Sequence, residues 1–136
     1  MKNSIKLLVS ILALVFVFSG CNKYEEGPSF SLLTKKARIS GTWKLEKTVT
    51  SEGFTYVADA SDTERMIIEK DGTIMFQDQG FALSGKWDFI KDKEYISMTF
   101  SFLGSTDIEE FQILRLKNKE LWLKDLDNDV MHYVPG

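Results

Sequence analysis

The fold is decided by residues 85–102, which read Gly85-Lys86-Trp87-Asp88-Phe89-Ile90-Lys91-Asp92-Lys93-Glu94-Tyr95-Ile96-Ser97-Met98-Thr99-Phe100-Ser101-Phe102. From Ile96 to Phe102 every second residue is apolar, and the residues between them are serine or threonine. This period of two predicts a strand with one buried face. A four-residue loop at 91–94 extends the same sorting to a second strand. It pairs Phe89 with Ile96 and Trp87 with Met98 on the apolar face, and Lys86 with Thr99 and Asp88 with Ser97 on the polar face.

A second hairpin is expected around Lys70-Asp71-Gly72. A two-residue Asp-Gly turn would put Ile74 beside Glu69 and mix polar with apolar residues. A three-residue loop with Gly72 in the left-handed region sorts the two faces, and register follows the buried face. The expected pairs are Ile68 with Ile74, Met66 with Phe76, and Glu69 with Thr73.

A third hairpin is expected at the tight turn Asn118-Lys119. Its register sets apolar residues opposite each other and opposite charges side by side. The expected pairs are Leu116 with Leu121, Leu114 with Leu123, Lys117 with Glu120, and Arg115 with Trp122.

Three further segments have strand character, Gly41 to Val49, Phe54 to Val57 and Val130 to Val134, and residues 31–39 have room for one or two helical turns. The total of about eight or nine short strands, without a βαβ alternation, is typical of all-β barrels. We predict a single antiparallel up-and-down β-barrel, because closure removes exposed sheet edges.

The N-terminus predicts export. Lys2 and Lys6 precede an apolar run over residues 7–18, interrupted by Ser10, which is short for a membrane span and typical of a signal peptide. Cys21 is the sole cysteine, so it has no internal disulfide partner. Ser19-Gly20-Cys21 resembles the lipobox of bacterial lipoproteins, although Phe18 stands where leucine is usual.

That resemblance implies cleavage before Cys21 and acylation of its thiol and new N-terminus, with palmitate-type chains holding the protein in membrane lipid. We therefore divide the chain into a signal peptide (1–20), a lipidated cysteine with a short tether (21–30) and a barrel domain (31–136). Asn22 is not the aspartate that retains such proteins at the inner membrane, and residues 23–26 resemble a charged tract for the outer face of the outer membrane. The expected location is the outer membrane, facing the periplasm or the cell surface.

Gly41-Thr42-Trp43 opens the first predicted strand. Gly-x-Trp ahead of a meander resembles the lipocalin signature, and the whole chain is similar to small lipocalin-like lipoproteins of Gram-negative bacteria. The resemblance implies that Trp43 packs at the closed end of the barrel. Lipocalins stack a late basic residue on this tryptophan, whereas no arginine follows Arg115 here, and cross-strand pairing assigns Arg115 to Trp122. The alternative reading of the motif is a strand start with a core tryptophan.

The composition argues against several functions. The net charge of −3 becomes −5 without the two lysines of residues 1–20, and no basic stripe suggests nucleic acid. His132 is the only histidine, and no Gly-x-Ser-x-Gly elbow or phosphate-binding glycine loop occurs. We therefore expect no enzyme, metal or cofactor. Asp125 to Asp129 could begin a calcium loop, but Val130 replaces the required glycine, so a polar turn is preferred. Glu109 and Glu110 should point to opposite faces.

The remaining functional signal is the apolar interior, which is expected either to fill the barrel or to line a pocket for a small apolar ligand. The two hypotheses are a ligand-binding lipoprotein and a tethered monomer whose solid barrel presents loops to a protein or glycan. The candidate cavity or core residues are Trp43, Met66, Ile68, Phe76, Trp87, Phe89, Ile96, Met98, Phe100, Leu114 and Leu123.

Overall fold

The computed structural model of the chain describes residues 33–136, so the predicted signal peptide and Cys21 lie outside the described residues. One short helix, α2 (Lys35–Ile39), precedes the strands, and the side chain of Thr34 caps it by accepting a hydrogen bond from the Ala37 amide at 3.1 Å. The strands are β1 (Gly41–Val49), β2 (Thr55–Val57), β3 (Arg65–Ile68), β4 (Thr73–Asp78), β5 (Phe81–Ile90), β6 (Tyr95–Phe102), β7 (Ser105–Lys117), β8 (Glu120–Lys124) and β9 (Val130–Pro135). No helix within residues 33–136 is long and apolar enough to cross a membrane.

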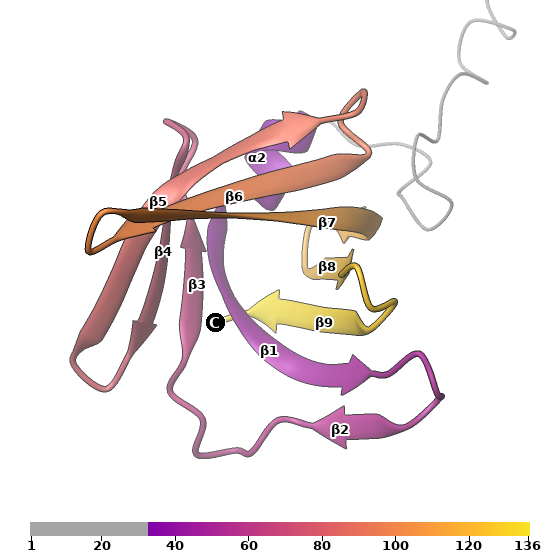
Figure 1. Ribbon diagram of the computed structural model, residues 1–136. Helices are drawn as coiled ribbons and strands as arrows, with labels where there is room; N and C mark the ends of the chain where they lie inside the picture. The colour runs from indigo at the N-terminus through magenta and orange to yellow at the C-terminus, as the bar shows by residue number, and fades with distance from the viewer. Residues whose placement is uncertain (1–32) are drawn as a thin grey trace, which may run out of the picture.

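All pairings between neighbouring strands are antiparallel, and the sheet closes because β1 also pairs with β9 (Figure 1). Strands β1 and β3 to β9 thus form a closed eight-stranded barrel, to which β2 adds one strand at the edge of β1. The prediction of an all-β up-and-down barrel is confirmed. Closure leaves the eight barrel strands without an unpaired edge.

The registers of two hairpins are as expected. β5 and β6 pair Trp87 with Met98 and Phe89 with Ile96. β3 and β4 pair Met66 with Phe76 and Ile68 with Ile74. Gly72 has a φ of 96°, as the three-residue loop requires. In both hairpins the alternation of apolar and polar residues was sufficient to fix the register.

The third hairpin differs from the prediction. Leu116 pairs with Leu121 and Arg115 with Trp122, as expected, but a β-bulge between residues 113 and 115 shifts the register. Leu123 therefore pairs with Ile113, so the expected pair with Leu114 is wrong. Ile113 is buried and Leu114 is only half-buried. The extra residue of a bulge is left without a cross-strand partner and turns away from the face that its spacing predicts.

The two ends of the barrel differ. The closed end carries α2 and the turns 69–72, 91–94 and 118–119, and the mouth carries the loops 50–54, 79–80, 103–104 and 125–129. At the closed end Trp43 is buried, and its indole N–H donates to the Ile39 carbonyl at 2.8 Å. At the mouth the Ser51 amide donates to Asp129 Oδ1 at 2.9 Å and joins two loops. The chain therefore enters the barrel at the closed end, opposite the mouth.

Candidate functional site

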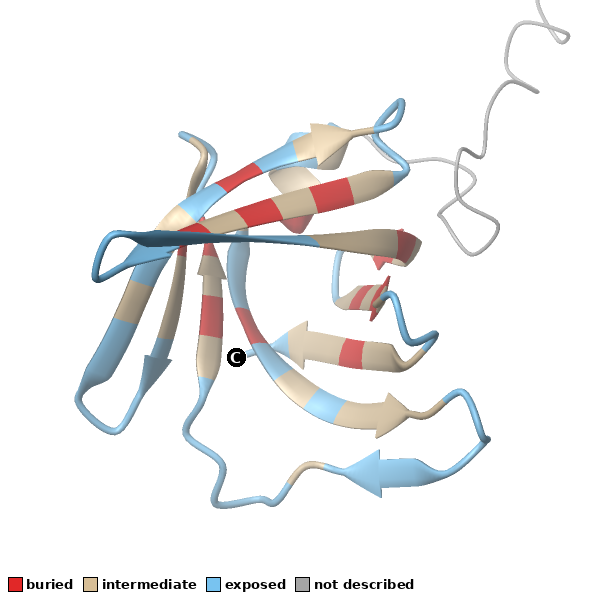
Figure 2. Cartoon of the chain, in the orientation of Figure 1, coloured by how far each residue is buried: buried red, intermediate tan, exposed pale blue. Residues whose placement is uncertain are grey.

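The inward face of β6 changes from fully buried to open along its length. The exposed fraction is 0% for Ile96, 1% for Met98, 8% for Phe100 and 63% for Phe102. All four side chains share one face, because side chains alternate along a strand. The closed half of the barrel is therefore filled, whereas solvent reaches the inner wall near the mouth. Figure 2 shows the same change, with buried segments in the middle of the sheet and exposed hairpin tips around the mouth.

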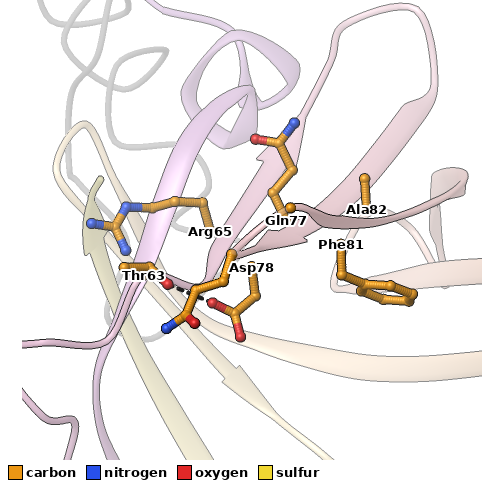
Figure 3. A pocket seen from close by; sticks show the side chains of 8 residues that line it. Thr63, Arg65, Gln77, Asp78, Phe81 and Ala82 are labelled. Atoms are coloured by element: carbon orange, nitrogen blue, oxygen red, sulfur yellow. Dashed lines mark hydrogen bonds between the residues drawn. The ribbon is translucent and has the colours of Figure 1, made fainter.

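The strands beside β6 carry the same pattern. Phe81 pairs with Asp78 in the β4–β5 register. Asp78 follows the buried Ile74 by four residues on β4, so the side chains of Asp78 and Phe81 are on the inward face. Both residues are nevertheless exposed. Figure 3 shows Asp78 and Phe81 on one side of this hairpin and Gln77 and Ala82 on the other. The Thr63 hydroxyl donates to Asp78 and fixes that carboxylate.

On β7 the inward positions near the mouth are acidic. Asp107 pairs with Phe100 and Glu109 pairs with Met98, so both carboxylates share the face of these buried side chains. Both acids are nevertheless exposed. Glu110 lies on the opposite face, where it forms a 2.9 Å ion pair with Lys91. The prediction that Glu109 and Glu110 point to opposite faces is confirmed.

Beneath the mouth lie aromatic rings. The rings of Phe76 and Phe100 are 5.6 Å apart and tilted by 48°. Gly85 is opposite Phe100, and a Cβ there would lie 2.6 Å from the Phe100 ring. The glycine therefore lets this ring lie across β5 toward β4. The result is an apolar floor below the acidic inner wall of the mouth.

Tyr133 on β9 also faces inward, opposite Leu121. Burial, with smaller contributions from the charges of Glu64 and Glu109, raises the pKa of Tyr133 to about 12. The phenol hydroxyl donates to Met131 Sδ at 3.8 Å, a weak acceptor. It can therefore form a stronger hydrogen bond with a ligand.

Hollows on the surface of residues 33–136 include three of about 300–400 Å³. One of about 360 Å³ lies at the mouth against the β4–β5 loop, lined by Thr63, Asp78 and Phe81 among others. Another of about 310 Å³ lies between β1 and the 57–65 connection. The third, of about 400 Å³, lies on the outside near Trp87 and is lined mainly by polar side chains. The first adjoins the inward residues Asp78 and Phe81 and is also bordered by Arg65, whereas Glu64 lines the second.

His132 is on the outer face and is 8% exposed. Its ring stacks on Trp122 at 4.0 Å, and the Arg115 guanidinium lies 3.8 Å from the centre of the Trp122 ring. The expected assignment of Arg115 to Trp122 is confirmed. Burial lowers the pKa of His132, and the nearby charge of Lys47 lowers that pKa further. The imidazole is a packing element of this stack, away from the mouth.

The aspartates before β9 build a turn. Asp125 Oδ1 accepts hydrogen bonds from the amides of Asp127 and Asp129, both at 2.9 Å, and Asn128 adopts a φ of 66°. This is the polar turn preferred from the sequence. Within the described residues 33–136, no group of three or more histidine, cysteine, aspartate or glutamate side chains is placed to hold a metal ion.

Most of the candidate residues from the sequence belong to the filled half. Phe76 and Phe89 pack against this core while half-buried, and Leu114 lies outside it. The buried candidates are Trp43, Met66, Ile68, Trp87, Ile96, Met98, Phe100 and Leu123. Sequence reasoning placed Phe102 on the inward face without selecting it for the site, and it did not select the other inward residues near the mouth, which are Asp78, Phe81, Asp107, Glu109 and Tyr133. In the sequence, Gly104 marks the β6–β7 turn that places Asp107 and Glu109 opposite β6, and in the structure Leu103 and Gly104 have φ values of 49° and 82°.

The closed barrel with a filled base and an open mouth defines a lipocalin-like fold. Two solved structures resemble it: a lipocalin-like protein from Bacteroides uniformis (TM-score 0.57, 14% identity, covering 73% of this chain and 99% of that one) and an uncharacterised protein from Bacteroides eggerthii (TM-score 0.58, 13% identity, covering 71% and 98%). No family model and no curated protein matches the sequence. At 14% and 13% sequence identity, the similarity shows a shared fold and nothing further.

Proposed function

We propose that this protein is an envelope-anchored lipocalin-like lipoprotein that binds a small molecule with an apolar body in the barrel mouth. The observation that carries the proposal is the exposure of Phe102 and Phe81, aromatic side chains on the inward face of a closed barrel. An aromatic ring left in contact with water inside a concave wall is available to a ligand that replaces that water. The signal and lipobox pattern at Ser19-Gly20-Cys21 supports the anchor.

The position of α2 at the closed end supports a protein that is anchored through its N-terminus and binds its ligand at the mouth. The described chain begins at the closed end, the end opposite the mouth. A lipid at Cys21 would then hold the molecule by its filled end. The mouth stays accessible to a solute in the surrounding compartment.

The test is a titration of the purified protein with a neutral apolar fluorophore, N-phenyl-1-naphthylamine. Phe102→Ser should weaken binding by about tenfold, the value of one aromatic contact. Ile108→Ser is the matched control, since Ile108 is 65% exposed, close to the 63% of Phe102, but pairs with Thr99 on the outer face. The control should bind as wild type does. Equal effects of the two substitutions would place the dye outside the barrel.

A second candidate function, presentation of loops to a protein or glycan, is favoured by Leu103 and Leu126. Both are on mouth loops, and their exposed fractions are 90% and 86%. Exposed leucines at loop tips are typical of contact surfaces. Failure of wild type to bind the dye, together with binding of a partner that Leu103→Ser abolishes, would favour this function.

A further inference from the structure

The charges of the barrel wall are sorted by face. Within β1 to β9, every lysine and arginine alternates with inward apolar residues and points outward. These residues are Lys44, Lys47, Arg65, Lys86, Arg115, Lys117 and Lys124. The inner wall therefore receives no positive charge from the strands.

Acids, in contrast, occur on both faces. Asp78, Asp107 and Glu109 share the inward face with buried side chains of their own or paired strands, and all three are near the mouth. Glu64, just before β3, instead lines the hollow between β1 and the 57–65 connection. The inward face of β7 near the mouth thus carries the negative charges of Asp107 and Glu109, whereas the hollow beside Asp78 is also bordered by Arg65.

The same space contains aromatic surface and a hydrogen-bonding group. Phe81 and Phe102 expose inward rings at the rim, and Phe76 and Phe100 lie below them. The Tyr133 hydroxyl has a thioether sulfur as its acceptor. Aromatic faces attract cations as well as apolar groups.

We infer that the ligand of the mouth is an organic cation, a protonated amine that carries an aromatic or aliphatic body. This inference rests on the proposed function and specifies its ligand class by charge complementarity. The ammonium group lies against Asp107 and Glu109 on the inward face of β7, a face that the Tyr133 side chain on β9 shares. The apolar body lies against Phe81 and Phe102. An anionic ligand of the same shape would meet the same carboxylates and be repelled.

The test compares three probes with one apolar body, 1-naphthylmethylamine, 1-naphthylmethanol and 1-naphthoate, by isothermal titration of the purified protein at pH 7. The amine should bind about tenfold tighter than the alcohol, as expected for a charge-assisted hydrogen bond, and the carboxylate should bind most weakly. If the alcohol or the carboxylate binds as tightly as the amine, the inference is wrong and the proposed function stands. If none of the three binds, both are wrong.

A pair of substitutions, Glu109→Gln and Glu110→Gln, tests which carboxylate contacts the ammonium group of the ligand. The two residues are neighbours on β7 but occupy opposite faces, so their substitutions are matched in chemistry and differ in location. Glu109→Gln should lower the affinity for the amine about five- to tenfold and leave the affinity for the alcohol unchanged. Glu110→Gln should change neither. Asp107→Asn, on the inward face, should repeat the effect of Glu109→Gln. An unchanged amine affinity in both inward variants would overturn the inference.

Discussion

At Gly72 the backbone has a φ of 96°, in a region that β-branched residues resist. A Cβ at this position would lie 3.6 Å from the Trp87 carbonyl oxygen, an ordinary contact, so space is not the constraint. Gly72→Val should therefore lower the free energy of unfolding by more than about 1 kcal/mol through backbone strain. Gly72→Asn should cost less, because asparagine tolerates the left-handed region. Urea unfolding checks both, and an unchanged midpoint for Gly72→Val would contradict the loop conformation.

The lowered pKa of His132 predicts that the free energy of unfolding depends on pH. Its pKa is below the ordinary 6.5, because burial disfavours the imidazolium, and the charges of Lys47 and Arg115 act in the same direction while Glu46 and Glu120 oppose it. The unfolded chain therefore binds a proton at a higher pH than the folded chain does. The stabilisation is fully present above pH 6.5 and is lost as the pH falls through 6.5 toward the lowered pKa.

The measurement is the free energy of unfolding at pH 7.5 and 5.5 for wild type and His132→Gln. Wild type should lose stability at the lower pH, and the variant should lose less, since glutamine does not titrate. The comparison removes the contribution of carboxylates, which is common to both proteins. An equal loss in the two proteins would show that another group controls this window.

At the level of elements, alternation alone predicted the β3–β4 and β5–β6 hairpins, because a one-residue slip would bury charges. It could not predict the bulge in β7. Ile113, Leu114 and Leu116 are all apolar, so an unbroken strand satisfies the pattern as well as a bulged one does. The geometry of the neighbouring pairs decides between them, and that information is not local.

The inward residues near the mouth could not be predicted from the sequence for a related reason. Around Asp107-Ile108-Glu109 the pattern favours an inward isoleucine, whereas pairing with β6 puts both acids inward. The register is fixed by the longer apolar part of β6 and β7, and the acids follow it. A rule that places charges outside fails where the interior is open to water. The filled part of the site was thus predictable from the sequence, and the open part was not.

The bulge can be tested by a pair of substitutions in β7. Ile113→Ala should lower the free energy of unfolding by about 2–5 kcal/mol, since Ile113 is 2% exposed and its removal leaves a cavity. Leu114→Ala removes a similar volume from a half-buried position and should cost less than about 1 kcal/mol. Urea unfolding of the two variants gives the order. The reverse order would restore the unbroken register and contradict the bulge.

At the scale of the whole molecule, the proposed anchor depends on Cys21, outside the described residues. Cys21→Ser should release the protein from membranes or leave an unprocessed precursor, because lipidation and cleavage are linked in the lipoproteins that the N-terminus resembles. Membrane fractionation with mass spectrometry of the intact chain distinguishes the outcomes, and Ser10→Ala, within the apolar run, serves as the control. A Cys21→Ser chain of mature size that remains wholly with the membranes would contradict the anchor.

The central claim is that one barrel is filled at its closed end and open at its mouth. Trp87 represents the filled end: it is 5% exposed, and its indole N–H donates to the Glu69 carbonyl at 2.7 Å. Phe102 represents the mouth. The most direct measurement is the free energy of unfolding of Trp87→Ala and Phe102→Ala in urea. We predict a loss of about 3–5 kcal/mol for Trp87→Ala and less than about 1 kcal/mol for Phe102→Ala. A loss for Phe102→Ala as large as that for Trp87→Ala would show that the mouth is filled, and the claim would be wrong.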